Sequence, residues 1–131
     1  MELNKINYTD LNSRQKENYN YHKIASALAE YGFDSMRLNN DWQGADFIAV
    51  HNDGEQMLKV QLKSRFTIDK KYIGKDIKIG FVEKGVCYIY DHDNMVLNLA
   101  EGTLNSKSWQ ENGYYSQMPV PKIYLDNMTE L

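Results

Sequence analysis

Two short runs of mostly aliphatic residues, separated by a polar turn, form the clearest pattern along the chain. The runs cover residues 45–51 and 57–64. Residues 52–55 between them contain an Asp-Gly pair, which supplies the positive φ that a tight turn needs. The pattern therefore predicts a β-hairpin. We expect His51 to pair with Gln56 at its closed end.

Alternation along the two predicted strands separates a polar set from an apolar set. In the expected register Asp46 lies opposite Gln61. Because strand side chains alternate between faces, Asp46, Gln61 and Lys63 share one face of the hairpin. The other face carries the expected core residues, which are Phe47, Ala49, Leu58, Val60 and Leu62. A slip of one residue would move a whole strand's set to the opposite face, so the register is a strict prediction.

A helical pattern precedes the hairpin, in residues 13–31. Asn12 or Ser13 suits the N-cap, and Gly32 suits the position after the helix. Apolar side chains recur at steps of three and four residues, namely Tyr21, Ile24, Ala25, Leu28 and Tyr31. Glu17 falls one turn before this series, on the stripe expected to be buried. It is either an N-terminal carboxylate favoured by the helix dipole or a carboxylate directed at a site on the sheet.

Strand and helix signals alternate through the rest of the chain. Residues 33–38, 76–82 and 86–90 are expected to be strands, 39–44 a loop, and 66–75 is ambiguous. A short helix is expected around Met95, Val96 and Leu99. A terminal helix is expected from Pro121 onwards, with Ile123, Tyr124, Met128 and Leu131. This order predicts an α/β (α+β) fold, with a mixed central sheet of about five strands flanked by helices.

Length and composition fit a single domain over residues 1–131. The one cysteine, Cys87, allows no internal disulfide and no cysteine-based zinc site, and we expect it to pack inside. The histidines lack the spacing of a paired metal-ligand motif, and His92 is expected to lie in a turn. No apolar run of about 18 residues and no secretory signal are present, so a cytoplasmic protein without a membrane partner is expected.

Charge is distributed unevenly along the chain. The formal net charge is −3, yet residues 57–84 carry a balance of +5, which leaves −8 for the remainder. This basic segment includes the residues that we expect to contact a nucleic-acid backbone, which are Arg65, Lys70, Lys71 and Lys75. The alternative is a charged, solvated face that binds nothing.

The polar face of the hairpin has the chemistry that phosphodiester hydrolysis needs. A hard cation such as Mg²⁺ takes oxygen ligands, which Asp46, the Gln61 amide and the Leu62 backbone carbonyl can supply. The cation lowers the pKa of water and stabilises charge on phosphate oxygens. The Lys63 ammonium can stabilise the transition state by about 3 to 4 kcal/mol. Taken singly, Asp46 is also typical of a turn cap, and Lys63 of a solvated strand residue.

The helix, the hairpin and the strand that ends in Val60-Gln61-Leu62-Lys63 resemble the αβββ start of the PD-(D/E)XK, or restriction-endonuclease-like, nuclease superfamily. The V-Q-x-K spelling is similar to the subset with Gln at the middle acidic position, which includes homing endonucleases of group I introns. Residues 74–93 resemble bacterial superfamily members of unassigned role. Together these matches cover roughly residues 13–95.

The resemblance implies a restriction-endonuclease-like core and a role for each candidate residue. Asp46 corresponds to the metal-binding aspartate, Gln61 to the usual Asp or Glu, and Lys63 to the motif lysine. Glu17 corresponds to the helix acid of many members, and Ala45 stands where the motif has proline. The neutral Gln61 amide is expected to weaken cation binding compared with a carboxylate.

The function implied by the resemblance is metal-dependent endonucleolytic hydrolysis of DNA, of a restriction, defence or mobile-element type. Mg²⁺ or Mn²⁺ is the expected cofactor, and cutting both strands calls for a homodimer or a higher homo-oligomer. Two other functions remain open at this point. One is a module of the same fold that binds nucleic acid without cutting it. The other is a regulatory protein-interaction domain, which suits the acidic net charge and the ten tyrosines.

Overall fold

Helix α1 (Ser13–Ala29) begins with a capping box in the computed structural model, which describes all residues 1–131. The Asn12 side chain accepts the Gln15 N–H, and the Gln15 side chain accepts the Asn12 N–H, which satisfies two donors of the first turn. The predicted N-cap is confirmed. Gly32 follows the helix with a φ of +87°.

The buried side of α1 differs from the predicted stripe at both ends. Asn20, Ile24 and Leu28 are buried against the sheet. Tyr31 is 51% exposed, because the helix ends at Ala29 and the chain turns away before reaching it. Glu17 is exposed as well, so its expected place on the buried stripe is wrong.

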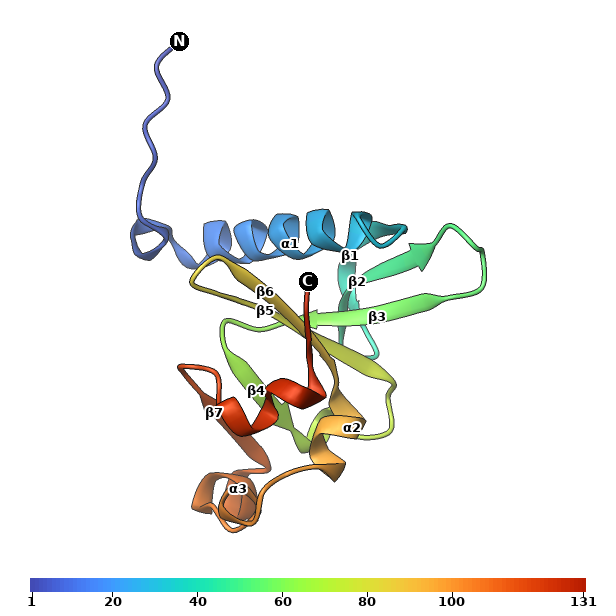
Figure 1. Cartoon of the computed structure of the whole chain (residues 1–131), viewed down its shortest axis with the longest axis vertical. Helices are drawn as coiled ribbons and strands as arrows, with labels where there is room; N and C mark the ends of the chain where they lie inside the picture. Colours follow the sequence, from blue (N-terminus) through green and yellow to red (C-terminus); the bar gives the residue numbers. More distant parts are fainter.

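Six strands form one mixed sheet, in the order β1-β2-β3-β5-β6-β8 (Figure 1). Neighbouring strands are antiparallel except β3 and β5, which are parallel. The strands are β1 (Phe33–Trp42), β2 (Ala45–His51), β3 (Met57–Leu62), β5 (Ile77–Glu83), β6 (Val86–Asp91) and β8 (Thr129–Glu130). An α+β fold with a mixed sheet is thus confirmed, with one strand more than the five expected.

The predicted register of the β2–β3 hairpin is confirmed. Phe47 pairs with Val60 and Ala49 with Leu58, while the His51 N–H donates to the Gln56 carbonyl at 2.9 Å. Phe47, Ala49 and Val60 are fully buried. Leu58 and Leu62 are partly buried and pack against the same cluster. The apolar face of the hairpin therefore faces the core as predicted.

Strand β1 is longer than predicted and includes most of the expected loop at 39–44. It continues to Trp42, which pairs with Ala45 across a two-residue turn. Gln43 and Gly44 both have positive φ, of 53° and 89°. Such a turn matches the twist of the flanking strands, so pairing can continue up to it. The register of β1 against β2 shifts between Arg37 and Trp42, which accommodates the additional residues of β1 in this part of the hairpin.

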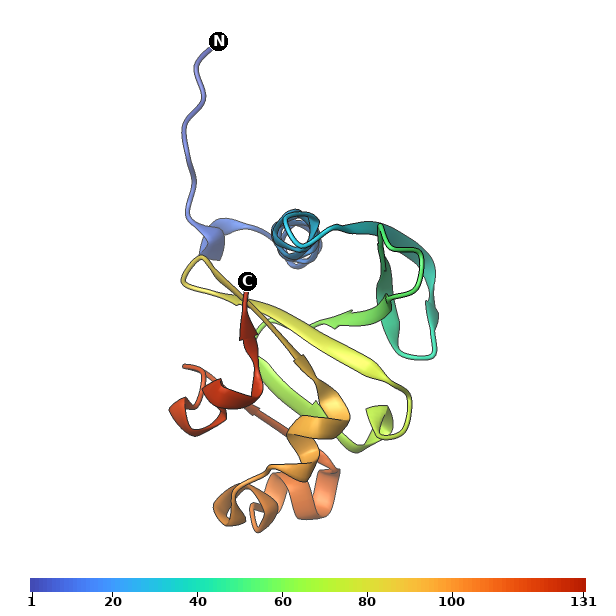
Figure 2. The same ribbon diagram turned by 45° about the vertical axis from the view of Figure 1, so that its right-hand side comes forward.

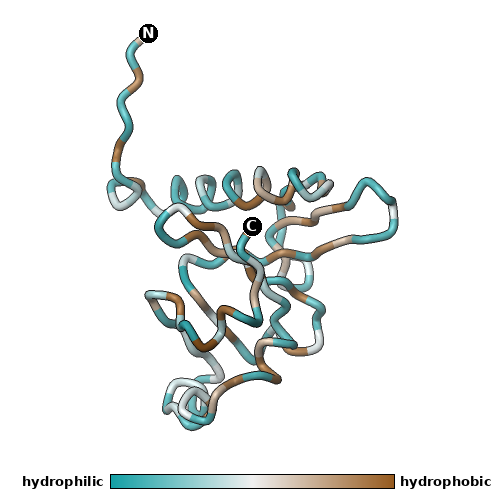
Figure 3. The backbone as a smooth tube through the Cα atoms, in the orientation of Figure 1, coloured by the Kyte–Doolittle hydropathy of each residue, from teal (hydrophilic) through white to brown (hydrophobic).

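The sheet lies between two unequal layers (Figure 2). Helix α1 covers one face, where Ile24, Leu28, Phe47, Ala49, Val60 and Cys87 form a core cluster, and Cys87 is buried as predicted. The other face is covered by the two-stranded sheet of β4 (Phe66–Asp69) and β7 (Tyr114–Gln117), with α2 (His92–Leu97) and α3 (Glu101–Leu104) beside it. Figure 3 shows apolar positions recurring along the strands, while the β2–β3 turn is polar.

Short helical turns complete the chain. They are η1 (Tyr8–Asp10), η2 (Lys70–Tyr72), the π-helix η3 (Ser108–Asn112) and η4 (Lys122–Asn127). The ambiguous stretch 66–75 is thus β4 followed by η2. The residues before η1 project from the body of the molecule (Figure 1). No helix has the length and apolar character needed to cross a membrane.

Two expectations for the later part of the chain are wrong. The terminal helix is the 3₁₀-helix η4 followed by β8, because Tyr124 anchors this turn through hydrogen bonds from the Ala100 N–H (2.9 Å) and with Thr103 (2.7 Å). His92 is not a turn residue. It is fully buried at the start of α2, where its Nε2 accepts the Asp69 N–H at 3.0 Å.

Candidate functional site

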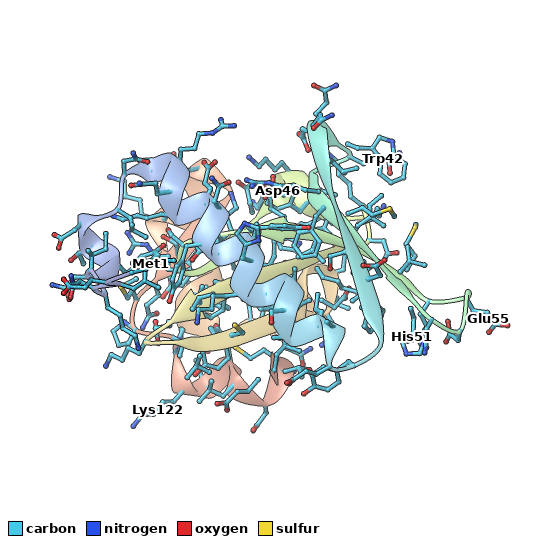
Figure 4. All side chains as sticks on the ribbon, turned by 90° about the horizontal axis from the view of Figure 1, so that it is seen from above. Met1, Trp42, Asp46, His51, Glu55 and Lys122 are labelled. Carbon is cyan, nitrogen blue, oxygen red and sulfur yellow. The ribbon has the colours of Figure 1, made fainter.

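A pocket of about 290 Å³ opens where α1, β1, β2 and the end of β3 meet. Its lining residues are Glu17, Arg37, Asp46, Gln61, Leu62 and Lys63. All four candidate catalytic residues of the sequence are therefore brought together on one pocket. Figure 4, which looks down on α1, shows Asp46 beside the helix and away from the hairpin turn that carries Glu55.

Asp46 is held across the hairpin by the strand opposite. Its Oδ2 accepts the Leu62 N–H at 2.8 Å. Burial raises the pKa of Asp46 above its ordinary value, and the nearby charges of Asp41 and Glu17 raise it further. The Leu62 hydrogen bond and the Lys63 ammonium oppose this rise without cancelling it. Burial is the largest cause, so the ionised carboxylate of Asp46 lacks part of the stabilisation that water would give it.

Gln61 and Leu62 contribute neutral oxygens beside Asp46. The Gln61 Nε2 donates to the Leu62 carbonyl oxygen at 3.3 Å. A cation at Leu62 O would require the amide to turn over and present its own oxygen. No three side chains among His, Cys, Asp and Glu gather closely enough to hold a metal ion on their own. With Asp46, the available donors are all oxygens, which suits Mg²⁺ or Mn²⁺ and not a softer metal.

Lys63 directly follows β3, and contacts hold both its backbone and its side-chain ammonium. Its backbone N–H donates to the Gly80 carbonyl of β5 at 2.9 Å. Its Nζ lies 5.4 Å from the centroid of the Tyr72 ring, which is within range of a cation–π interaction. The lysine is therefore held close enough to Asp46 to lower the pKa of that carboxyl.

Tyr72 supports the site, and sequence reasoning missed it. Its ring packs so closely on Gly44 that a Cβ there would lie 3.1 Å from the ring. Burial raises the pKa of the Tyr72 hydroxyl, and the charges of Asp69, Asp46 and Asp41 add to the rise. Tyr72 falls in the ambiguous stretch 66–75, where an aromatic residue among lysines was the only signal.

Arg37 is a second residue that sequence reasoning missed. It pairs with Phe47 across β1 and β2, and its guanidinium lies 5.2 Å from the Tyr21 ring centroid. Arg37 Nη1 also donates to the Asn18 side chain of α1. These contacts direct a permanent positive charge to the pocket. The available signal was its position in a predicted strand, which does not indicate a partner on α1.

The four predicted nucleic-acid contacts lie in different surroundings. Lys71 Nζ lies 5.1 Å from the Tyr72 ring centroid and 3.9 Å from Asp69, so it shares Tyr72 with Lys63. Lys70 packs over Trp109, with 5.2 Å from Nζ to the ring centroid. Lys75 lines another pocket, and Arg65 is exposed between β3 and β4. Of the four, Lys71 is the one tied to the candidate site through a shared side chain.

Comparison with protein-family models found no match for this chain, and neither did comparison with curated proteins or with solved structures. The candidate function consequently rests on the pocket and on the residues that line it.

Proposed function

We propose that the protein is a metal-dependent endonuclease that hydrolyses DNA phosphodiester bonds in the pocket lined by Glu17, Asp46, Gln61 and Lys63. The observation that carries the proposal is that these four side chains, from a helix, two strands and the end of a strand, line one pocket. A shared pocket places these side chains where one phosphate and one cation can be bound together.

The arrangement of α1 and the first three strands supports a restriction-endonuclease-like core. Helix α1 is followed by the antiparallel β1, β2 and β3, and it packs on the face of that sheet. The order of one helix and three strands is the same as in the αβββ start that the sequence resembles. The connection from β3 to its parallel neighbour β5 runs through β4 and η2.

The oxygens of Asp46, Gln61 and Leu62 would hold the cation. When bound, a Mg²⁺ or Mn²⁺ ion supplies a lowered pKa of water and charge compensation for phosphate oxygens. Its charge would also stabilise the ionised form of the partly buried Asp46 carboxyl. Because Gln61 is neutral, Glu17 provides the second carboxylate of the pocket.

The chain's own cations act on the substrate. Lys63, held over the Tyr72 ring, stands beside Asp46 to orient the attacking water and to stabilise the charge that develops on the phosphate. Arg37, on the α1 side of the pocket, neutralises a second phosphate oxygen. Both groups are held by contacts within the protein, so little reorganisation is needed at the moment of reaction.

Cleavage of plasmid DNA tests the proposal. Wild type is expected to nick or cut DNA with Mg²⁺ or Mn²⁺ and to be inactive in EDTA. Asp46→Ala and Lys63→Ala are each expected to abolish cleavage, whereas Lys122→Ala, at an exposed lysine of η4, keeps the wild-type rate. Equal cleavage by wild type and both pocket variants would show a contaminating nuclease and refute the proposal.

A nucleic-acid-binding module without catalysis is the second candidate. Two observations favour it: Gln61 is neutral, and no three side chains of the metal-binding types gather in the structure. In this case wild type binds DNA with a steep salt dependence and does not cut it. A protein that neither cuts nor binds DNA would instead support the regulatory protein-interaction role.

A further inference from the structure

A second pocket, of about 280 Å³, adjoins the first one. The two share Glu17, Leu62 and Lys63 as a common wall. The second pocket extends from this wall over the first turns of α1 to η1, at Lys16, Asn20 and Tyr8. We propose that it binds the phosphate group next to the scissile one in the same DNA strand. The proposal rests on the proposed function and assigns the neighbouring part of the substrate.

The side chains around this pocket are mostly hydrogen-bond donors or cations. Lys16 and Lys63 supply two ammonium groups, and Ser13 and Ser64 supply hydroxyls. Glu17 is the one carboxylate in the lining, so the pocket has a net positive charge. The first pocket contains two carboxylates, Glu17 and Asp46. Arg37 and Lys63 balance these two carboxylates, whereas the second pocket has two cations against one carboxylate, so the second pocket is the better suited of the two to an anion.

Asn20 adds a hydrogen-bond donor to the lining of the second pocket. Its side chain is buried, with 5% exposure, and its Oδ1 accepts the Tyr8 hydroxyl at 3.3 Å. Its amide nitrogen makes no hydrogen bond within the protein, and it is not among the fully enclosed polar atoms that lack a partner. Asn20 lines this pocket and also a neighbouring one, which it shares with Tyr8, Tyr19 and Val82. Its amide N–H groups are therefore free to donate to a phosphate oxygen in the second pocket.

Contacts within the protein hold the far wall of the pocket. The Tyr8 ring packs on Tyr19, with 5.1 Å between ring centroids, and Lys16 Nζ lies 5.6 Å from the Tyr8 ring centroid. Together with the hydrogen bond to Asn20, these contacts fix η1 against α1. The second pocket is thus built by packed side chains, and the Lys16 ammonium is held in place over the Tyr8 ring.

Titrating the protein with a phosphate probe in EDTA, with amide NMR signals as the readout, tests the second pocket without metal or catalysis. The probes are inorganic phosphate and a short single-stranded oligothymidylate. Both are expected to shift the Asn20 side-chain amide and the Ser64 backbone amide in a saturable way. The oligothymidylate is expected to bind at least about tenfold more tightly, because its neighbouring phosphates and bases make contacts that a single phosphate ion cannot make. Equal affinity for the two probes would overturn the assignment to a DNA strand.

Two lysines on the same helix provide a matched pair of variants. Lys16 and Lys23 each lie over a tyrosine ring, at 5.6 and 5.5 Å, but only Lys16 lines the pocket. Lys16→Gln is expected to remove one phosphate contact, so the slope of log affinity for the oligothymidylate against log salt becomes shallower by about 0.7. Lys23→Gln should leave the slope unchanged.

Absence of saturable shifts at Asn20 and Ser64, or equal slopes for Lys16→Gln and Lys23→Gln, would overturn the second pocket as a phosphate site. A different result would refute the proposed nuclease activity while leaving the phosphate site intact. In that case no DNA is cut with Mg²⁺, while the phosphate-dependent shifts in EDTA persist.

Discussion

Replacing Gln61 by Glu adds a carboxylate to the pocket. The loss in the free energy of unfolding without metal can be worked out from the structure. The variant loses the hydrogen bond from Gln61 Nε2 to Leu62 O (3.3 Å), which is worth about 1 kcal/mol. Gln61 also lines the same pocket as Asp46, and the two residues come directly before and after the paired Phe47 and Val60. Two negative charges about 5 Å apart would repel by about 3 kcal/mol at an effective dielectric constant of about 20.

Water in the pocket screens part of this repulsion, so the free energy of unfolding in EDTA is expected to fall by about 2 to 3 kcal/mol in total. Bound Mg²⁺ is expected to compensate for much of this loss in the free energy of unfolding. A ligand of the folded state adds RT ln(1 + [L]/Kd) to the free energy of unfolding, about 2.7 kcal/mol at 100 times Kd. A carboxylate in place of the amide lowers Kd, so Gln61→Glu gains more from the same Mg²⁺ concentration than wild type does.

Urea unfolding with EDTA or with Mg²⁺ measures both effects, and the buried Trp109 provides a fluorescence signal. Gln110→Glu is the matched control, because the Gln110 side chain also donates to a backbone carbonyl, that of Leu104, outside the pocket. The control is expected to lose stability equally with and without Mg²⁺. If Mg²⁺ stabilises Gln61→Glu no more than wild type, the assignment of this position to a cation site is refuted.

Three further predictions concern the support of the site and the fold. Tyr72→Phe keeps the ring beneath Lys63 and should retain the cleavage rate, whereas Tyr72→Leu should slow it by about tenfold; equal rates would exclude the positioning role. Burial lowers the pKa of His92 below its ordinary value of 6.5, so the unfolded state binds the proton first. The free energy of unfolding should therefore be highest above about pH 6.5 and fall as the pH drops below it, and urea unfolding of His92→Gln should show a shallower fall. Phe47→Ala empties a fully buried position packed edge-on against Tyr21 and should cost about 3 to 5 kcal/mol in urea unfolding; a loss below about 1 kcal/mol would place Phe47 outside the core.

The β2–β3 hairpin could be predicted from the sequence because its turn and its faces are determined locally. Gly54 adopts the positive φ that the turn requires, at +76°, and Asp53 Oδ1 accepts the Glu55 N–H at 2.8 Å. Alternation then determines which residues reach the core. The capping box of α1 is local in the same sense, since Asn12 and Gln15 are three residues apart.

The short elements could not be predicted because distant partners stabilise them. Strand β4 pairs with β7, which follows much later in the chain. Its residues Phe66, Thr67 and Ile68 are buried in succession, so they lack the alternation that indicates a strand. Strand β8 has two residues and exists through pairing with β6. Similarly, β1 extends past its apolar part because the turn at Gln43 and Gly44 keeps it paired.

The candidate site was accessible from spacing, whereas its supporting residues were not. Asp46, Gln61 and Lys63 lie on one hairpin, so a local register relates them. Tyr72, Arg37 and Lys16 come from η2, β1 and α1, and their positions around the two pockets depend on the tertiary fold. Glu17 could be predicted only in part. The helical period placed it near the sheet, but the structure was needed to show that it is exposed and lines both pockets.

Nicking of supercoiled plasmid by wild type and Asp46→Asn, each with Mg²⁺ and with EDTA, tests the central claim most directly. Asp46→Asn keeps an acceptor for the Leu62 N–H and removes the charge, so folding is expected to be preserved. The proposed function predicts nicking by wild type with Mg²⁺ and a loss of at least about 100-fold in the other three reactions. Nicking at the same rate in all four reactions, or in none, would contradict it.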